Sequence, residues 1–496
     1  MTDTKKVRVR FAPSPTGELH IGSLRTALIC FLFAQKNKGT FIFRAEDTDR
    51  KRFVEGATER QLRDLYWAGV SVDEGVVLED DAVVEKGDYG PYIQSNRIDI
   101  YKKHVDELVK EDKAYHCFCS ADRLQEMRER QQTQKLPPKY DRKCLDLTKE
   151  EIQTKIDNRE DYVVRFKIPK GKTQFNDLVY GKIIVDNETL DDLVIMKSDG
   201  FPTYHLAVVV DDYLMKVSHI FRGMEWLPSA PKHVLLYNAF GWTSDMPEFC
   251  HMANILNKNK KKLSKREGSV SVADFRAEGY PKEAIINFIA LLGWNPKTEQ
   301  EIFTMDELID QFDTAKMNKA GGVFDLDRLA WMSKEHIKKM SVDEIYDDAI
   351  SFLQQKDYFK NAIKEQQSKS YIKRIIVVEQ DRLENFTQIG EDNRFFFANV
   401  TTDKDLLKWK DNSFEQTKHV LKKAQEVLSA VDTNDWTRKN LEMLLMDAAE
   451  DKRGDFLWPL RAALTGKKHS PSPFDCAWIF GKEETLHRLE MAIDLL

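Results

Sequence analysis

The sequence has few cysteines, no long apolar run and no marked excess of one charge. Only 6 of the 496 residues are cysteine, which argues against a secreted disulfide scaffold and leads us to expect a reducing, cytoplasmic environment. No run of about 18 apolar residues could cross a bilayer. The first residues, MTDTKKVRVRF, lack the apolar core of a signal peptide. We therefore expect no association with a membrane.

The balance of charge also limits the interpretation. The formal net charge of −6 gives no sign of nucleic-acid binding by the whole chain, although a local basic face would still permit it. A composition of 42 % hydrophobic and 32 % charged residues is typical of a globular protein. A chain of this length predicts about two to four domains.

The most informative stretch is residues 7–23, VRVRFAPSPTGELHIGS. Alternation predicts a strand over 7–11, Pro13 and Pro15 break it, and apolar spacing predicts a helix through 24–35. A helix N-terminus that follows a strand offers unpaired N–H groups to an anion. Gly22 would let a nucleotide approach the backbone, and His20 could donate a hydrogen bond to a phosphate. The alternative is an ordinary strand-to-helix corner.

A second strand is predicted over 40–45, followed by the charged run 46–50, EDTDR. Open α/β sheets place ligand contacts just past a strand, which favours a functional Glu46. The same run could instead cap the predicted helix 55–68 through Thr48 or Asp49. Both interpretations can hold together.

Three cysteines form a second constellation. Cys117 and Cys119 are one residue apart and Cys144 follows after a short excursion, so their thiolates could bind one soft ion. A tetrahedral zinc site needs a fourth ligand, for which Tyr140 and Asp146 are the nearest candidates, while His116 is expected to point away. The alternative is three free thiols.

Strands are predicted again over 162–169, 182–187 and 193–198, and a strongly apolar stretch at 201–212 ends in Asp211 and Asp212. The segment 217–223 then predicts a buried strand with Arg222 at its carboxyl end. A buried arginine requires an anion. That anion is either a substrate or one of the two aspartates.

A basic loop, KNKKKLSKREG, occupies residues 258–268. Lys262 and Lys265 flank Ser264 in this loop, and lysines on a flexible loop suit the phosphates from which pyrophosphate leaves. The alternative is a solvated basic loop.

The motifs His20–Ser23 and Lys262–Arg266 together resemble the two signatures of class I aminoacyl-tRNA synthetases. With RFAPSPTGELHIGSLRTAL, FRAEDTDR, GPYIQSNR, PTYHLAVVVDD and PLRAALTG, the whole chain resembles glutamyl-tRNA synthetase of the bacterial or organellar type. The resemblance implies an α/β Rossmann-type catalytic domain with an α+β insertion, followed by an all-helical anticodon-binding region. The implied parts are residues 1–115 and 213–332 for the catalytic domain and its stem-contact region, 116–212 for an acceptor-stem-binding insertion, and 333–496 for the anticodon-binding region.

The implied activity is ATP-dependent ligation of L-glutamate to the 3′ end of tRNA(Glu) through a glutamyl-adenylate, with release of AMP and pyrophosphate. Mg²⁺ would accompany ATP, and the enzyme would be a monomer. The alternatives are an enzyme that also charges tRNA(Gln), or an inactive tRNA-binding paralogue. A glutamyl-queuosine synthetase would lack the C-terminal half, and a glutaminyl enzyme would carry β-barrels in it.

The resemblance also implies roles for individual residues. The catalytic positions are His20, Gly22, Lys262 and Lys265, and the ATP-binding positions add Glu225 and Ser264. The glutamate-binding positions are Arg10, Ala12, Ser14, Glu46, Tyr204 and Arg222. The implied zinc ligands are Cys117, Cys119, Tyr140 and Cys144.

The C-terminal half has cations beside aromatic residues at 373–374, 408–410 and 418–423. Such groups could follow an RNA backbone and stack on splayed bases. Each one alone is more simply a solvated helix face.

Overall fold

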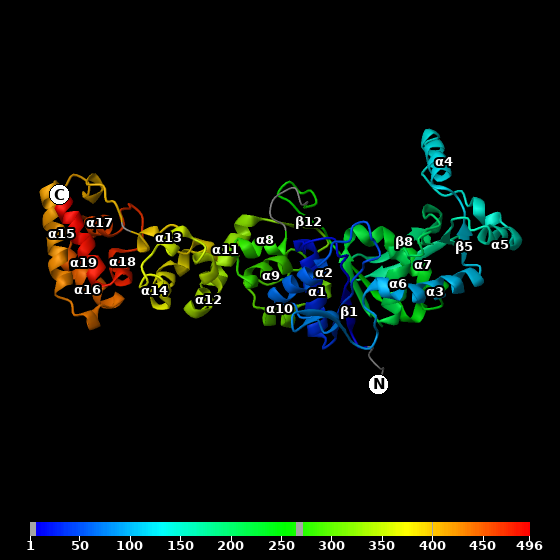
Figure 1. Ribbon diagram of the computed structural model, residues 1–496, viewed down its shortest axis with the longest axis horizontal. Helices are drawn as coiled ribbons and strands as arrows, with labels where there is room; N and C mark the ends of the chain where they lie inside the picture. Colours follow the sequence, from blue (N-terminus) through cyan, green and yellow to red (C-terminus); the bar gives the residue numbers. More distant parts are fainter. Residues whose placement is uncertain (1–5, 264–270, 399) are drawn as a thin grey trace. The chain divides into compact units, whose positions relative to one another are not determined.

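The computed structural model describes residues 6–263, 271–398 and 400–496, and the chain divides into two compact units (Figure 1). Unit 1 comprises Met1–Phe275 and Ile285–Leu326, and unit 2 comprises Arg276–Ala284 and Asp327–Leu496. None of the helices in the described part of the chain combines the length and apolar character needed to cross a bilayer.

Unit 1 is built on an eight-stranded sheet with the order β4-β3-β2-β1-β10-β11-β7-β8. The six strands from β3 to β7 in this order are parallel neighbours, whereas the edge strands β4 and β8 run antiparallel. The strands are β1 (Arg8–Phe11), β2 (Thr40–Phe43), β3 (Glu74–Glu79), β4 (Ala82–Lys86), β7 (Lys172–Asp177), β8 (Gly181–Asp186), β10 (His219–Gly223) and β11 (Glu248–Met252).

The strand order reverses between β1 and β10. From β1 the chain passes through α1 (Ile21–Lys36) to β2 on one side, whereas β10 and β11 lie on the other side. In an open parallel sheet the crevice outside the carboxyl ends at such a switch point is where ligands bind. The predicted strands 7–11 and 217–223 are β1 and β10, and they therefore meet at this point.

Helices flank the sheet of unit 1, and α1 packs against β1, β2 and β10. The other helices are α2 (Ala57–Trp67), α3 (Ile98–Lys110), α6 (Tyr204–Leu214), α7 (Ala230–Ala239), α8 (Val272–Ala277), α9 (Lys282–Leu291, across the unit boundary) and α10 (Met305–Gln311). A short pair of parallel strands, β12 (Ile255–Leu256) and β13 (Gly322–Val323), completes the unit. The apolar stretch at 201–212 falls largely in α6.

The segment between the two halves of the catalytic sheet contributes to two sheets. β5 (Ala114–Cys117), β6 (Val163–Phe166) and β9 (Val194–Met196) form a separate antiparallel sheet beside α4 (Ala121–Thr133) and α5 (Lys149–Asp157). The hairpin β7–β8 instead extends the main sheet, where Asp177 pairs with Phe249 of β11. The strands predicted at 162–169, 182–187 and 193–198 are β6, β8 and β9, and β7 was not predicted.

One local expectation is wrong. Neither Thr48 nor Asp49 caps α2, because the cap residue is Gly56 in a left-handed conformation (φ 71°) and provides no side-chain hydrogen bond. Asp49 instead forms an exposed ion pair with Arg52 at 2.7 Å. The loop after Glu46 is therefore longer than the sequence suggested, and Glu46 is left to line a cleft.

In unit 2 the described residues form helices and no strand, around one apolar core. The α-helices are α11 (Leu326–Ile337, which begins at the last residue of unit 1), α12 (Val342–Leu353), α13 (Asp357–Lys360), α14 (Lys369–Glu379), α15 (Phe414–Ser429), α16 (Arg438–Ala449), α17 (Arg453–Thr465), α18 (Pro473–Phe480) and α19 (Lys482–Leu495).

Candidate active site

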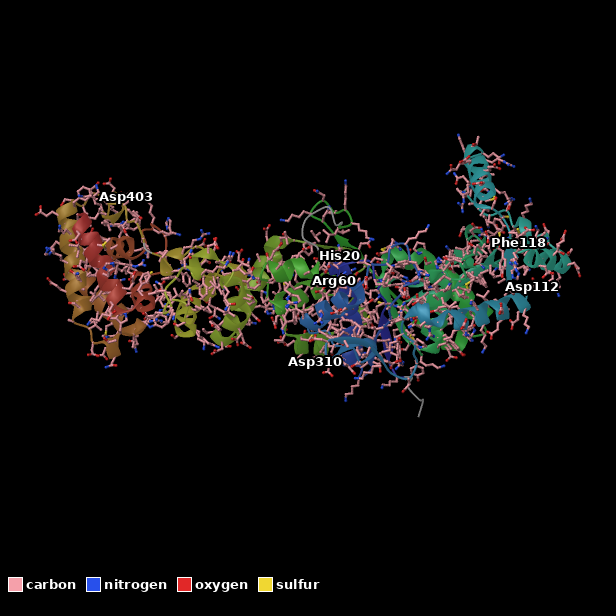
Figure 2. All side chains as sticks on the ribbon, viewed as in Figure 1. His20, Arg60, Asp112, Phe118, Asp310 and Asp403 are labelled. Atoms are coloured by element: carbon pink, nitrogen blue, oxygen red, sulfur yellow. The ribbon has the colours of Figure 1, made fainter. Side chains whose placement is uncertain are left out.

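A cleft of about 540 Å³ opens beyond the carboxyl ends of β1 and β10. It brings together residues that are up to about 250 positions apart in the sequence, and Figure 2 labels one of them, His20, near the start of α1. All the predicted catalytic, ATP-binding and glutamate-binding residues that the structure describes line this cleft: Arg10, Ala12, Ser14, His20, Gly22, Glu46, Tyr204, Arg222, Glu225 and Lys262. Ser264 and Lys265 lie outside the described residues.

One end of the cleft is a buried charge network. Arg10 donates from Nε to Asp212 Oδ1 at 3.0 Å, and the fully buried Arg44 donates to the same oxygen at 2.7 Å. Arg44 also holds Glu46 at 3.0 Å. Burial alone would raise the pKa of Asp212, but Arg10 and Arg44 outweigh it and hold that pKa below its ordinary value. The network is therefore charged and rigidly partnered before any ligand binds.

Glu46 differs from Asp212 because it has only part of this support. Burial raises the pKa of Glu46, against the opposing effects of Arg44 and Arg10. Its carboxylate lines the cleft close to the backbone of β1's following loop, where its own N–H donates to Pro13 O at 3.0 Å. This carboxylate is suitably placed to accept a hydrogen bond from an ammonium group.

Arg222 behaves differently from Arg10, although both are buried. In the described part of the chain no carboxylate lies within ion-pair distance of Arg222, and its buried Nη2 has no hydrogen-bond partner. Its contacts are neutral: Nε donates to His251 at 3.0 Å, and Nη1 lies 3.1 Å from His233 and 3.5 Å from the Tyr204 hydroxyl. Burial lowers the pKa of Arg222. The alternative prediction, that Arg222 forms an ion pair with Asp211 or Asp212, is therefore wrong. These aspartates pair with other arginines.

The other end of the cleft begins at the N-terminus of α1. His20 is the cap residue of this helix, and its Nδ1 accepts from the Gly22 N–H at 3.0 Å. That N–H is thus not open to a phosphate, contrary to expectation. Because Nδ1 is an acceptor, the neutral ring carries its proton on Nε2, which can donate. A Cβ on Gly22 would meet only the ring of His20 at 3.4 Å, so the cleft beyond is open to a ligand.

Lys262 and Glu225 face each other across this end. Lys262 Nζ lies 3.1 Å from Glu225 Oε1, and their side chains are 58 % and 44 % exposed. Exposed pairs of this kind contribute only about 0–1 kcal/mol. An incoming polyanion can therefore displace the lysine from Glu225 at small cost.

Arg25 was not predicted from the sequence, but it lies on α1 and lines the same cleft. Its Nε and Nη1 are buried with no hydrogen-bond partner among the described residues, and burial lowers its pKa to about 10. The signal was present as an arginine two residues after the motif at residues 20–23, inside a largely apolar helix. Trp226, whose ring lies 4.6 Å from that of Tyr204, was missed as well.

The three predicted cysteines come together away from the cleft. Cys117, Cys119 and Cys144 place their Sγ atoms within 4.8 Å of one another, and the Tyr140 hydroxyl lies 3.3 Å from both Cys117 and Cys119. A tetrahedral site with metal–ligand distances of about 2.0–2.3 Å has edges of roughly 3.3–3.8 Å. The separations of Tyr140 from Cys117 and Cys119, both 3.3 Å, and of Cys119 from Cys144, 3.4 Å, match such edges. Hydrogen bonds, first from Cys144 and then from Tyr140, outweigh burial and lower the pKa of Cys117 to about 4. Asp146 is exposed and not part of this group.

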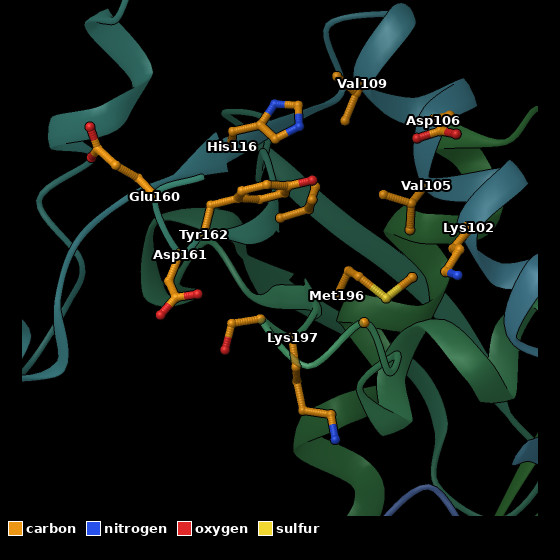
Figure 3. A pocket seen from close by; sticks show the side chains of 13 residues that line it. Lys102, Val105, Asp106, Val109, His116, Glu160, Asp161, Tyr162, Met196 and Lys197 are labelled. Carbon is orange, nitrogen blue, oxygen red and sulfur yellow. The ribbon is translucent and has the colours of Figure 1, made fainter. Parts of the chain in front are cut away.

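His116 turns away from the cysteines, as expected for a neighbouring residue on a strand. It faces a separate cavity of about 310 Å³, where its ring packs edge-on against Tyr162 with 4.9 Å between ring centres (Figure 3). The cavity wall also carries Lys102, Asp106 and Glu160.

Several of the basic residues predicted to contact RNA in unit 2 form contacts within the fold. Lys373 forms an ion pair with Asp343, and Lys423 pairs with Glu450 at 3.0 Å. The indole of Trp409 packs against Trp458, with 5.1 Å between ring centres. These contacts favour the structural interpretation of the three basic segments.

Comparison with known proteins agrees with this architecture. The family model "tRNA synthetases class I (E and Q), catalytic domain" matches residues 6–331, and "Anticodon binding domain" matches residues 333–493. Glutamate–tRNA ligase from Alkaliphilus metalliredigens is 44 % identical over 98 % of both chains. That from Clostridioides difficile is 43 % identical over 97 % of this chain and 98 % of the relative.

A solved structure is similar over almost the whole chain. The crystal structure of a glutamate tRNA ligase from Elizabethkingia meningosepticum in complex with its amino acid has a TM-score of 0.87 and 36 % identity, and covers 99 % of this chain and 100 % of that one. The switch-point cleft and the matching domains define a class I aminoacyl-tRNA synthetase with a helical anticodon-binding domain. Within this class, the chain belongs to the glutamate–tRNA ligase family.

Proposed function

We propose that this enzyme joins L-glutamate to the 3′ end of tRNA(Glu) at the expense of ATP. The observation that carries the proposal is the buried Nη2 of Arg222, which has no hydrogen-bond partner in the described part of the chain and lies at one end of a cleft whose other end presents His20 and Lys262. A buried cation without a counter-ion calls for an anionic ligand. Glutamate has a side-chain carboxylate to offer there.

The reaction has two steps. The α-carboxylate of glutamate attacks the α-phosphorus of ATP, the bond to the β-phosphate breaks, and pyrophosphate leaves. The terminal ribose hydroxyl of the tRNA then attacks the glutamyl carbonyl, and AMP leaves. An ionised carboxylate needs no general base for the first step, so positioning and charge stabilisation provide the catalysis.

At the buried end, Arg222 and Arg10 grip the side-chain carboxylate, and Tyr204 donates its hydroxyl to it. Glu46, Ser14 and the Ala12 backbone receive the ammonium group. Glutamine would leave the Arg222 guanidinium facing a neutral amide, which costs more than a lost attraction because a buried charge remains uncompensated.

At the open end, His20 donates from Nε2 to a phosphate, and Gly22 lets the nucleotide approach α1. Lys262 leaves Glu225 and, with Lys265 and Ser264 of the same loop, neutralises the departing pyrophosphate. Arg25, which lines the same cleft, adds a buried positive charge. ATP enters as its magnesium complex, so the ion belongs to the substrate.

The remaining parts of the chain bind the tRNA. Residues 116–212 hold the acceptor stem, and residues 333–496 hold the anticodon loop. We expect a monomer in the cytoplasm, and the absence of a disulfide among the six cysteines, all of which the structure describes, is consistent with that compartment. Sedimentation velocity at micromolar concentration tests the oligomeric state, and a concentration-dependent dimer would contradict it.

The test of the function is glutamate charging of purified tRNA(Glu) and tRNA(Gln) transcripts with MgATP. We expect tRNA(Glu) to be charged, and charging of tRNA(Glu) alone would identify a discriminating enzyme. Charging of both would identify a non-discriminating enzyme. Charging of neither by folded protein would overturn the assignment.

We further propose that Cys117, Cys119, Tyr140 and Cys144 hold a structural zinc ion. Bound there, zinc would tie the loop after β5 to residue 144 and add no chemistry to the reaction. Two thiols 3.4 Å apart, Cys119 and Cys144, and a hydroxyl shared by two thiols support this set. Elemental analysis of protein purified without chelator should give about one zinc per chain, and Cys144→Ser should lower it; a ratio near zero in the wild type would rule the site out.

A further inference from the structure

The side chain of Arg222 is held by acceptors that carry no charge. Its Nε donates to His251 Nε2 at 3.0 Å, and its Nη1 donates to His233 Nδ1 at 3.1 Å. Since a guanidinium has donors only, each of these ring nitrogens must present a lone pair. Burial lowers the pKa of both histidines, that of His233 especially, which keeps the rings neutral.

The proton on His251 is fixed from the far side of its ring. Asp177 Oδ2 lies 2.6 Å from His251 Nδ1 and also accepts from the His251 backbone N–H at 3.1 Å. Asp177 Oδ1 accepts from the N–H groups of Val179 and Tyr180, so the carboxylate is used entirely as an acceptor. The His251 proton therefore sits on Nδ1, and Nε2 is left as the acceptor for Arg222.

Both members of this pair lie deep in the sheet and outside the cleft wall. His251 is fully buried on β11 and Asp177 is 3 % exposed at the end of β7. His251 contacts the cleft residue Arg222, whose Nη2 has no hydrogen-bond partner among the residues that the structure describes. The orientation of Nη2 is thus set by a hydrogen-bond chain that begins on β7.

We propose that Asp177 and His251 are positioning residues that aim the Nη2 of Arg222 at the side-chain carboxylate of glutamate. This inference rests on the function proposed above, in which Arg222 grips that carboxylate. It gives the hairpin β7–β8, which is part of the segment between the two catalytic halves, a direct role in recognising the amino acid.

The competing explanation is structural. Asp177 and His251 could simply tie β7 to β11, in which case the contact between Asp177 and His251 would matter and the contact between His251 and Arg222 would not. Two substitutions at one position separate these explanations, because asparagine and glutamine imitate opposite ends of an imidazole ring.

Asparagine places its amide nitrogen where His251 has Nδ1, so His251→Asn keeps a donor to Asp177 and leaves Arg222 without its acceptor. Glutamine reaches the position of Nε2, so His251→Gln keeps an acceptor for Arg222 and loses the contact with Asp177. If Asp177 and His251 position Arg222, His251→Asn should impair glutamate recognition and His251→Gln should largely retain it. A structural tie predicts the reverse order.

The experiment is steady-state charging of tRNA(Glu) at saturating tRNA and MgATP, with glutamate varied. We expect His251→Asn to raise KM for glutamate roughly tenfold or more with little change in kcat, as for a lost hydrogen bond to a charged group. His251→Gln should stay within about threefold of the wild type. Glu248→Gln, on the same strand with a 63 % exposed side chain, is the matched control and should leave KM unchanged.

The outcomes are distinct. Charging by the wild-type enzyme tests the proposed function before any variant is compared. Equal KM values for all variants, or a larger KM for His251→Gln than for His251→Asn, would overturn the positioning role of Asp177 and His251 and leave the proposed function in place.

A measurement on the wild type covers the case in which a variant does not fold. In ¹⁵N-histidine-labelled protein near pH 7.5, the His251 signal should show the neutral Nδ1–H form, assigned by its absence from one of the His251 variants or by through-space contacts to the Arg222 side chain. An Nε2–H form or an imidazolium would overturn the proposal.

Discussion

The two ends of the cleft hold their charged groups in opposite ways. At the glutamate end the charged groups other than Arg222 are buried and paired in advance, and Arg10 and Arg44 both donate to one oxygen of Asp212. At the nucleotide end, Lys262 and Glu225 form a single pair that is about half exposed. The first end is rigid before the substrate arrives, and the second can exchange partners.

This difference fits what each substrate requires. Discrimination of a carboxylate from an amide needs fixed, desolvated charges, because only these make the wrong ligand costly. The triphosphate changes its charge distribution as pyrophosphate leaves, so cations that follow it are more useful than fixed ones. Substitutions at the two ends should therefore separate effects on stability from effects on catalysis.

The largest effect is expected at Arg222. Arg222→Met removes a cation that has no carboxylate partner among the described residues, so we expect kcat/KM for glutamate to fall roughly a thousandfold, or about 4 kcal/mol, while stability is unchanged or slightly raised. Charging kinetics and urea unfolding measure the two quantities. Lower stability together with normal glutamate kinetics would place Arg222 among the structural pairs.

At Asp212 the opposite outcome is expected. Asp212→Asn leaves Arg10 and Arg44 buried without their shared counter-ion, which should lower the free energy of unfolding by about 3–4 kcal/mol. Urea unfolding of the variant checks this value. A stable Asp212→Asn protein would mean that the network is looser than the distances of 2.7 and 3.0 Å indicate.

Much of this cleft could be predicted from the sequence because its residues lie at strand ends and helix starts that short sequence patterns indicate. Arg10 ends a strand before two prolines, His20 begins a helix, and Arg222 ends a buried strand, so each lies where a parallel sheet places ligand contacts. Their partners could not be predicted in the same way. The sequence suggested Asp211 or Asp212 as the ion-pair partner of Arg222. In the structure, Asp212 forms its ion pair with Arg10 instead.

The strand β7 shows why the rest was missed. Its buried positions are Thr173, Phe175 and Asp177, so two of the three inward side chains are polar and the usual alternation of apolar and polar residues is hidden. The burial of Asp177 is explained by its hydrogen bond with His251, which lies 74 positions away in the sequence. Pairings over such distances depend on strand order, which no local pattern records.

Unit 2 contains a buried carboxyl group that lacks the arginine partners seen in the cleft. Glu379 accepts from the Gly390 N–H at 3.0 Å and from Asn393, and burial raises its pKa to about 7. Above about pH 4.5 the unfolded chain loses this proton while the folded chain keeps it until about pH 7. The stability of unit 2 should therefore fall as pH rises through this window, by about 3 kcal/mol at most.

Hydrogen exchange of α14 peptides between pH 5 and 8, corrected for intrinsic rates, measures this loss. Glu379→Gln should remove the dependence, whereas Glu365→Gln, at an exposed position, should retain it. A flat profile in the wild type would show that neutral donors alone stabilise a buried carboxylate as well as arginines do.

At the open end, Lys262→Met should lower kcat/KM for ATP roughly thirtyfold, or about 2 kcal/mol, because one cation beside the leaving pyrophosphate is lost. Stability should change by less than about 1 kcal/mol, since the pair with Glu225 is exposed. Lys261→Met, the neighbouring residue on the same loop, is the control and should retain ATP kinetics. Equal losses in both variants would reduce Lys262 to one member of a general basic loop.

The smallest effect is expected at Glu225, and it gives the finest test of the comparison. Glu225→Gln keeps the hydrogen-bonding shape and removes the charge that attracts Lys262 at 3.1 Å. Because the lysine must leave this partner whenever ATP binds, losing an exposed pair worth about 0–1 kcal/mol should change KM for ATP by about threefold or less. A change of more than tenfold would mean that the carboxylate is fixed on the nucleotide during the reaction. The open end would then be organised in advance like the glutamate end, and the contrast between the two would hold only for the lysines.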